Sequence, residues 1–381
     1  MEISRMRRIV AAFDSFKGSL TSLEAGEAFR CGIVDVCPDA DVKVLAIADG
    51  GEGMAEAVKE SVGGEWVIAN VHDPLGRSIE ARYVVINDGH TAVMAMSAAS
   101  GLTLLAANEL NPLCASTYGT GELILDAIGR GCSEVIVGLG GSATNDGGAG
   151  MLRALGYRFY DDCGRELTAT IDILERVSRL SAEERSDRLN GVRLRVAADV
   201  DSPLYGPMGA SYVFARQKGA NDSVIERMDR AMQHYANVVD KEKASWAGAG
   251  AAGGLGYAFM SLLGAEMRSG IDVILSLVDF DAVASEAMLI ATGEGSVDYQ
   301  TLRGKAPHGV LTASMRLGIP CVVVGGRVSD ETELISGGFS AVYEATPRTM
   351  PQSVAMQKSV AMSNVRAVGR RVACEWLKGA L

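Results

Sequence analysis

The sequence predicts an α/β fold built on parallel sheets. Short apolar runs rich in Val and Ile alternate with longer amphipathic segments, and several of the runs end in glycine-rich loops. This alternation of strand, loop and helix is typical of parallel sheets. The composition agrees with this class, because 48% of the residues are apolar, 6% are aromatic and 45 of the 381 residues are glycine.

The N-terminal elements follow the β-loop-α pattern twice. A strand over Arg8–Phe13 precedes a loop over 14–20, and the capping box Thr21-Ser-Leu-Glu24 then opens a helix. A second strand over 42–48 ends at the loop Asp49-Gly-Gly-Glu-Gly53, which leads into another helix. Two successive units of this kind predict neighbouring parallel strands.

The C-terminal part repeats the pattern. We expect strands over 287–291, 321–324 and 341–343, with helices over 307–317 and 351–378. The strands are short and β-branched, and glycine follows the first two closely. The two ends of the chain are therefore expected to share one sheet.

The domain organisation follows from this arrangement. A chain of 381 residues exceeds what one core usually holds, so two domains are expected. Residues 1–65 and 285–381 then form one discontinuous α/β domain, and residues 66–284 form a second α/β domain inserted into it. The inserted part opens with two strands over 65–71 and 79–86 that read as a hairpin.

Charge and cysteine content exclude several classes of protein. The net charge of −11 argues against binding of nucleic acid, which requires a basic surface. No apolar stretch approaches 18 residues, so we expect no membrane-spanning helix and no membrane partner. Seven cysteines without a CxxC pair argue against a disulfide framework or a zinc site. We expect a cytoplasmic protein. The sequence leaves open whether it is a monomer or a homodimer.

The segment Val135-Ile-Val-Gly-Leu-Gly-Gly-Ser-Ala-Thr-Asn-Asp-Gly-Gly148 carries the most chemical information. An apolar strand ends there in a loop of glycines, hydrogen-bonding side chains and one Asp. Glycine lets successive backbone N–H groups approach phosphate oxygens closely, and a carboxylate suits Mg²⁺. The segment therefore predicts phosphoryl transfer.

Carboxylates recur in loops that follow predicted strands, mostly beside glycine. The four loops are Asp49-Gly-Gly-Glu52, Gly140-Gly-Ser-Ala-Thr-Asn-Asp146, Asp199-Val-Asp201 and Gly293-Glu-Gly-Ser-Val-Asp298. In open α/β sheets, ligands bind beyond the carboxyl ends of the strands, so these loops are candidates for a phosphate and Mg²⁺ site. The alternative for each single Asp is that it caps the next helix.

Three lysines lie in short polar loops rather than on amphipathic helices. They are Lys17, Lys218 and Lys305, and each follows or precedes a glycine. A lysine in such a loop can neutralise phosphate or carboxylate as a point charge. The alternative is an exposed lysine without a ligand.

Two other functions compete with phosphoryl transfer. Gly138-Leu-Gly-Gly-Ser-Ala143 fits a dinucleotide fingerprint after a strand, which would suit an NAD-dependent 2-hydroxy acid dehydrogenase. The five residues 144–148 intervene, however, where the helix of that motif should already be running. A non-catalytic nucleotide-binding protein is the second alternative.

A series of motifs along nearly the whole chain resembles the bacterial glycerate kinase family. They are Phe13-Asp-Ser-Phe-Lys-Gly-Ser19, Ala48-Asp-Gly-Gly-Glu-Gly53, Ser100-Gly-Leu102, Asn111-Pro-Leu113, Thr117-Tyr-Gly-Thr-Gly-Glu122, Gly140-Gly-Ser-Ala-Thr-Asn-Asp-Gly-Gly148, Gln217-Lys-Gly-Ala220, Gly248-Ala-Gly-Ala-Ala-Gly-Gly-Leu-Gly256, Thr292-Gly-Glu-Gly295, Asp298-Tyr-Gln-Thr301 and Gly304-Lys305. The resemblance implies phosphorylation of D-glycerate by ATP with Mg²⁺. It also implies a discontinuous Rossmann/flavodoxin-like parallel-sheet domain with a second α/β domain inserted.

The residues of the expected site are assigned on the loops described above. Glycerate is expected near Asp14, Ser15, Lys17, Gly50 and Glu52, and the nucleotide near Gly140, Gly141, Ser142, Thr144, Asn145, Lys218 and Gly253. The candidate metal ligands are Asp146, Asp201, Glu294 and Asp298. Catalytic roles are expected for Lys17, Asp49, Asp146, Asp201 and Lys305.

The chain departs from the pattern of that family at three positions. Ala95 stands where Glu is common, Met54 where Thr is usual, and Ser296 where Arg is frequent. If that Arg contacts phosphate, another cation such as Lys305 or Arg303 must replace it here. The resemblance suggests phosphorylation at O2 of glycerate, while the residues alone leave O2 and O3 open.

Overall fold

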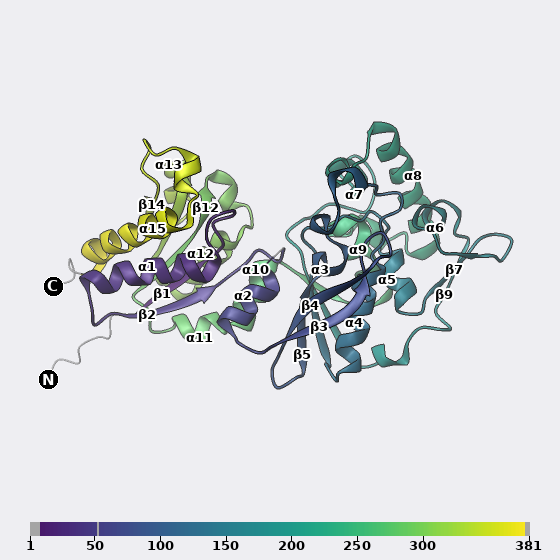
Figure 1. Cartoon of the computed structure of the whole chain (residues 1–381), viewed down its shortest axis with the longest axis horizontal. Helices are drawn as coiled ribbons and strands as arrows, with labels where there is room; N and C mark the ends of the chain where they lie inside the picture. Colours follow the sequence, from purple (N-terminus) through teal and green to yellow (C-terminus); the bar gives the residue numbers. More distant parts are fainter. Residues whose placement is uncertain (1–7, 52, 378–381) are drawn as a thin grey trace. The chain divides into compact units, whose positions relative to one another are not determined.

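The computed structural model describes residues 8–51 and 53–377. The chain divides into two compact units (Figure 1). The first unit comprises Met1–Asp49, Glu56–Gly63 and Gly270–Leu381, and the second comprises Gly50–Ala55 and Gly64–Ser269. The α/β class expected from the sequence is confirmed in both units.

The first unit alternates strands and helices. Its elements are β1 (Arg8–Phe13), α1 (Ser22–Val36), β2 (Asp41–Ala46), most of α2 (Met54–Ser61), α10 (Gly270–Leu277), α11 (Phe280–Ala284), β12 (Leu289–Val297), α12 (Ala306–Leu317), β13 (Cys321–Val328), α13 (Glu331–Ser336), β14 (Ala341–Glu344), α14 (Gln352–Ala355) and α15 (Lys358–Val372). The predicted capping box is present, since Thr21 Oγ1 accepts from Glu24 N and the Glu24 side chain accepts from Thr21 N.

The unit boundary after Ser269 differs from the predicted domain boundary at 284. Helices α10 and α11 lie between these positions, and both contact α12 of the first unit. The sequence between them is apolar without a strand signal, so its packing partner was not evident. All the predicted domain boundaries, including the one at 284, stay a prediction.

The sheet of the first unit is parallel and doubly wound. Over the described residues it has five strands in the order β14-β13-β12-β1-β2. When the five strands are numbered within this unit alone, the order is 2-1-3-4-5, as in flavodoxin-like folds. The direction of the strand order reverses between β1 and β12. Helices α1 and α15 pack against each other on one face, while α10, α11 and α12 form a second group on the other (Figure 1).

Two strands of this sheet are longer than predicted. The segments 293–296 and 325–326 were expected to be loops, but β12 runs to Val297 and β13 to Val328. The reason is close contact between the two strands. A Cβ on Gly293 would lie 2.1 Å from the carbonyl oxygen of Val324, so glycine there permits strand pairing rather than a turn.

The second unit holds the other elements. They are β3 (Glu65–His72), β4 (Ser78–Ile86), β5 (Thr91–Ala95), α3 (Ser97–Ser100), α4 (Tyr118–Gly129), β6 (Glu134–Gly138), α5 (Ala149–Ala154), β7 (Arg158–Tyr160), β8 (Glu166–Leu167), α6 (Thr170–Arg176), β9 (Arg179–Ser181), β10 (Arg193–Ala197), α7 (Ala210–Phe214), α8 (Asp222–Val239), α9 (Ala251–Leu262) and β11 (Glu266–Arg268). A mixed sheet in the order β11-β10-β6-β5-β4-β3 forms its centre. The predicted hairpin of β3 and β4 is confirmed as an antiparallel pair.

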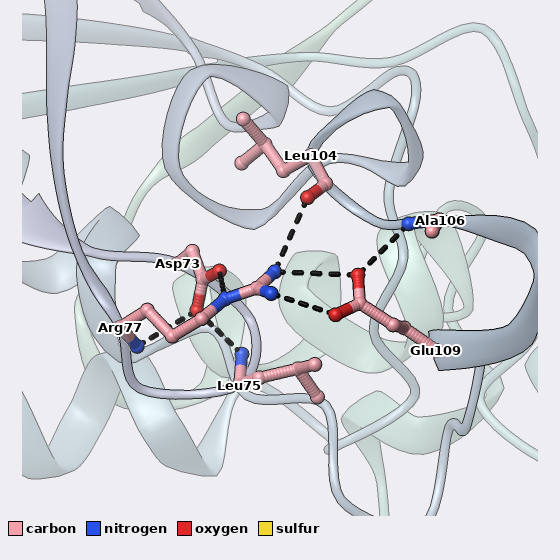
Figure 2. A network of polar contacts seen from close by, with 6 residues as sticks. All are labelled: Asp73, Leu75, Arg77, Leu104, Ala106 and Glu109. Carbon is pink, nitrogen blue, oxygen red and sulfur yellow. Dashed lines mark hydrogen bonds and ion pairs between the residues drawn. The ribbon is translucent and has the colours of Figure 1, made fainter.

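A polar network holds the turn of this hairpin against the segment 102–109 (Figure 2). The carboxylate of Asp73, which is 2% exposed, accepts hydrogen bonds from the backbone N–H groups of Leu75 and Arg77. The guanidinium of Arg77 donates to Asp73, to Glu109 and to the carbonyl oxygen of Leu104. Glu109 in turn accepts from the N–H of Ala106. The turn therefore fixes a segment that consists mainly of two short 3₁₀ helices, Leu102–Leu104 and Ala107–Glu109.

No helix among residues 8–51 and 53–377 combines the length and the apolar character needed to cross a membrane.

Candidate functional site

A pocket lies in the first unit at the carboxyl ends of β1, β12 and β13. It has a volume of about 360 Å³. This edge holds the point where the strand order reverses, which is where open α/β sheets bind ligands. The ionisable side chains of its lining are Asp14, Lys17, Asp49, Glu294, Lys305 and Arg327. Three acids and three bases thus face one space.

Asp14 follows the last residue of β1 and is held in the sheet edge. Its N–H donates to the carbonyl oxygen of Gly293 on β12, which extends the ladder by one residue. Only 7% of Asp14 is exposed, and its Oδ1 accepts from the N–H of Ser15 at 2.6 Å. Burial, together with the nearby charge of Asp49, raises the pKa of Asp14 to about 7. Asp14 can therefore exchange a proton near neutral pH.

Glu294 lies next to Asp14 in the sheet, on β12. Its Oε1 accepts from Thr301 Oγ1 at 3.0 Å and from Lys305 Nζ at 3.5 Å. Burial raises the pKa of Glu294, while the charge of Lys305 opposes the change. The carboxylate is therefore oriented by two partners and faces the pocket.

Glycine allows the loop after β1 to cross the sheet edge. A Cβ on Gly295 would lie 3.4 Å from Phe16 Cα and 3.5 Å from Lys17 N, and one on Gly326 would lie 2.5 Å from the carbonyl oxygen of Gly295. A Cβ on Gly295 would thus only touch the backbone before Lys17, whereas one on Gly326 would clash with the backbone of β12. The glycines at the ends of β12 and β13 thus make room for the site.

The structure brings together six of the predicted residues in this pocket: Asp14, Ser15, Lys17, Asp49, Glu294 and Lys305. Asp298 lies outside it, where its Oδ1 accepts from Gln300 N and caps a short 3₁₀ helix over Tyr299–Leu302. Gly50 belongs to the second unit, where a Cβ on Gly138 would lie 2.4 Å from its carbonyl oxygen. Glu52 lies outside the described residues.

Sequence reasoning did not select Arg327, which lines the same pocket. It lies on β13 in a segment expected to follow a turn, and its strand pairs with β12 so that Arg327 is opposite Ser296. The signal was the repeated pattern of glycines beside charged residues after a β-branched run. Of the two cations expected to compensate for Ser296, Lys305 lines the pocket. Arg303 instead lies over the ring of Tyr299.

The glycine loop of the second unit follows β6 and is built around Asp146. This residue is fully buried. Its carboxylate accepts from Thr117 N and Thr117 Oγ1 at 2.8 Å each, from Gly148 N at 3.0 Å and from Gly150 N at 3.1 Å. Burial raises the pKa of Asp146, although these four hydrogen bonds act to lower it. The carboxylate therefore shapes the loop and the start of α5.

Lys218 and Gly253 contact the same loop. Lys218 is 2% exposed, and its Nζ donates to the carbonyl oxygen of Thr144 at 2.6 Å and contacts Ser142 Oγ at 3.5 Å. Burial lowers the pKa of Lys218 to about 7, although the charge of Asp146 acts in the opposite direction. Gly253 has a φ of +68°, and a Cβ there would lie 2.1 Å from the Thr144 carbonyl oxygen.

The other predicted residues of the second unit differ in exposure. Thr144 and Asn145 are fully buried and Ser142 is 6% exposed, whereas Gly140 is half-buried and Gly141 is exposed. Asn145 Nδ2 donates to Ser211 Oγ. Asp201 is exposed in the segment that follows β10. The outer part of the loop therefore presents backbone, and its inner part is packed into the unit.

The predicted metal ligands fall into both units. Glu294 and Asp298 belong to the first, and Asp146 and Asp201 to the second. In the described part of the chain, a group of three possible ligand atoms within reach of one ion occurs at Asp161, Asp162 and Cys163. Asp161 there is paired with Arg165 and Arg176, so this group is part of an ion-pair network in the turn between β7 and β8.

A doubly wound sheet with an acidic and basic pocket at its switch point, together with a separate glycine loop, suits an α/β phosphotransferase. The model of the glycerate kinase family matches residues 9–377. The chain belongs to the glycerate kinase family. This membership does not support the dehydrogenase or the non-catalytic alternative.

Individual relatives agree with the family model. The glycerate kinase of Bacillus subtilis (strain 168) is 41% identical over 349 residues, which are 90% of this chain and 91% of that protein. The glycerate 2-kinase of Escherichia coli (strain K12) is 39% identical over 341 residues, 88% and 90% of the two chains. A crystal structure from Salmonella typhimurium LT2, assigned to glycerate kinase 2, has a TM-score of 0.88 at 38% identity and covers 98% of this chain and 99% of that one.

Proposed function

We propose that this chain transfers a phosphoryl group from ATP, with Mg²⁺, to the O2 hydroxyl of D-glycerate. The observation that carries the proposal is the pocket in the first unit, where three carboxylates and three cations surround a space suited to a small polar anion. The membership in the glycerate kinase family supports the substrate and the donor. The choice of O2 rests on the likeness to a glycerate 2-kinase.

Asp14 is the proposed acceptor of the proton from the attacking hydroxyl. It lies at the strand switch point and lines the pocket, and its Ser15 contact fixes one carboxylate oxygen. A base is most effective when its pKa lies near the working pH, and burial raises the pKa of Asp14 to about 7. The transfer itself depends mainly on positioning and charge neutralisation.

The donors present in the pocket fit Mg²⁺. This ion takes oxygen ligands, keeps several waters and binds proteins through one or two carboxylates, which Glu294 and Asp49 offer here. When bound, Mg²⁺ neutralises charge on the phosphate oxygens of the nucleotide. Lys17 and Lys305 supply further positive charge, and Lys305 also orients Glu294 through the contact with Oε1.

The glycine loop of the second unit is the proposed site for the phosphates of ATP. Its outer residues Gly140 and Gly141 present backbone N–H groups, which suit phosphate oxygens. Since Asp146 and Lys218 are buried, we assign them to the support of the loop rather than to contact with the nucleotide or the metal. Asp201 is exposed and keeps its predicted metal role as a proposal.

The proposal includes ATP as the donor, Mg²⁺ as the metal and the cytoplasm as the location of the enzyme. A supply of ATP and glycerate is expected in the cytoplasm, where we place the enzyme. A homodimer is a separate expectation, which light scattering after size-exclusion chromatography tests.

The proposal is tested with purified protein, ATP, MgCl₂ and D-glycerate. ADP release is followed in a coupled assay, and the product is identified by phosphorus NMR. We expect ADP formation that depends on glycerate and a product phosphorylated at O2. A product phosphorylated at O3 would refute the regiochemistry. ADP release that is unchanged without glycerate would refute the acceptor.

A further inference from the structure

Among the described residues that line the pocket, Arg327 is the only one with a guanidinium group. It lies near the end of β13, and 40% of its side chain is exposed. Its Nη2 donates to the carbonyl oxygen of Met350 at 2.8 Å and its Nη1 to that of Pro347 at 3.4 Å. Glu344 Oε1 lies 3.7 Å from Nη1. The guanidinium is thus held from one side by the segment that precedes α14.

The contacts that hold Arg327 leave part of its donor capacity for a ligand. A guanidinium has about five N–H donors in one plane, and two of them serve the carbonyl oxygens of Pro347 and Met350. Its neighbour across the β12–β13 pair is Ser296, whose short side chain also lines the pocket. A small neighbour on this side leaves room in front of the guanidinium.

The position of Arg327 relative to Asp14 suits a short hydroxy acid. Asp14 follows β1, and Arg327 lies on β13, with β12 between these two strands. Neighbouring strands are about 4.8 Å apart, so the two backbones are separated by roughly two such spacings across the sheet. Arg327 also lies two positions farther along the strands, because it is opposite Ser296 whereas Asp14 is beside Glu294. Both residues line the same pocket. In glycerate the O2 hydroxyl is on the carbon next to the carboxylate, so one small acid can present both groups to this pocket.

The chemistry of the three pocket cations separates their roles. Arginine matches a carboxylate with two parallel N–H donors, whereas lysine acts as a point charge. Lys305 is already directed to Glu294 at 3.5 Å. Lys17 is exposed on the loop after β1, where it lies closer to Asp14 in the chain than to β13.

We propose that Arg327 binds the carboxylate of the acceptor and thereby makes the enzyme selective for hydroxy acids over neutral polyols. This inference rests on the proposed function. Arg327 is a specificity-determining residue in it, while Asp14 takes the proton of the O2 hydroxyl next to that carboxylate. The competing explanation is structural, in which Arg327 only holds the segment around Pro347 and Met350.

The test compares Arg327→Met and Arg327→Lys with the unaltered enzyme on two acceptors, D-glycerate and the neutral D-glyceramide. Loss of a carboxylate contact should raise KM for glycerate about 10- to 100-fold at a kcat within a few-fold of the starting value. The preference for glycerate over glyceramide should fall by the same factor. Arg327→Lys should recover part of the lost affinity, because it keeps the charge without the fork.

Arg348→Met is the matched control. Arg348 also pairs with Glu344, but its side chain is 87% exposed and it does not line the pocket, so its replacement should leave both constants unchanged. A fall of kcat at saturating glycerate with an unchanged KM would overturn the inference in favour of a structural role. An unchanged preference for glycerate in Arg327→Met would also overturn it. If the unaltered enzyme does not phosphorylate glycerate, the proposed function fails instead.

Discussion

Lys218 donates a hydrogen bond of 2.6 Å to the main-chain carbonyl of Thr144 from a position that is 2% exposed. The polar segment around Lys218 suggested a lysine open to a ligand. The structure instead buries its ammonium beneath the glycine loop. Glycine residues by themselves can adopt many backbone conformations. This contact explains how a loop rich in glycine keeps one of them.

We therefore expect Lys218→Met to weaken the loop from within. The variant leaves the Thr144 carbonyl without its charged donor, which should lower the free energy of unfolding of the second unit by about 1–3 kcal/mol. It should also raise KM for ATP more than KM for glycerate. Denaturant unfolding and steady-state kinetics measure both effects, with the exposed Lys241→Met as the control. Unchanged stability together with an unchanged KM for ATP would contradict the supporting role.

Asp14→Asn should lower kcat strongly, because an amide cannot accept the proton of the attacking hydroxyl. A decrease of about 10²- to 10⁴-fold is typical for loss of a general base. Asp39→Asn serves as the control, since Asp39 is exposed ahead of β2, at the opposite edge of the sheet from the pocket. In the unaltered enzyme, kcat/KM should rise as the pH increases through about 7, where Asp14 loses its proton. A flat profile between pH 5.5 and 8.5 would count against Asp14 as the base.

The same carboxyl should affect stability in the opposite direction. The pKa of Asp14 is raised from 3.8 to about 7, so between these values the native state binds more protons than the unfolded state. The contribution of Asp14 to the free energy of unfolding is therefore fully present at low pH and is lost as the pH rises toward 7. Asp14→Asn should stabilise the first unit at pH 8 by on the order of 2 kcal/mol and reduce this slope. Denaturant titrations at pH 5 and pH 8 measure how stability depends on pH. A dependence that Asp14→Asn leaves unchanged would contradict the burial argument.

Gly253→Ala should disrupt the glycine loop through its backbone. The added Cβ would lie 2.1 Å from the Thr144 carbonyl oxygen and 2.6 Å from Asn145 Cα, and neither atom can rotate away. Gly264→Ala is the matched control, because Gly264 has a similar φ of +62° but no atom within 4 Å of a Cβ. We expect the control to lose about 1 kcal/mol and Gly253→Ala to lose roughly 3 kcal/mol or more. Equal losses in thermal or denaturant unfolding would show that the contact with Thr144 does not matter.

Glu294→Gln should raise the Mg²⁺ concentration required for half-maximal activity. Replacing a carboxylate ligand, or a group that orients the site, typically costs about 10- to 100-fold in metal affinity. Asp298→Asn should have a smaller effect, because the Asp298 side chain caps the Tyr299–Leu302 helix outside the pocket. Activity is titrated with MgCl₂ at fixed ATP. A larger shift for Asp298→Asn than for Glu294→Gln would reverse the assignment.

Much of the fold could be predicted because local signals in the sequence agree with the packing. The strand Arg8–Phe13 has the predicted bounds, and the capping box at Thr21 opens helix α1. Glycine misled the prediction at 293–296 and 325–326, since the same residue serves turns and close strand pairs. The choice between them depends on a neighbouring strand that lies far away in the chain.

The candidate site could be predicted only in part for a related reason. Asp14 and Glu294 follow strands predicted from the sequence, and a parallel sheet brings such positions to one edge. Residue type alone does not reveal burial, so Asp146 and Lys218 looked as accessible as Lys17. Arg327 was missed because its position in the pocket depends on the pairing of β12 with β13.

A crystal structure of the protein with bound D-glycerate tests the central claim most directly. The account predicts glycerate in the pocket of the first unit, with a hydroxyl within hydrogen-bond distance of the Asp14 carboxyl group. Glycerate bound at the glycine loop of the second unit, or elsewhere with this pocket empty, would contradict it.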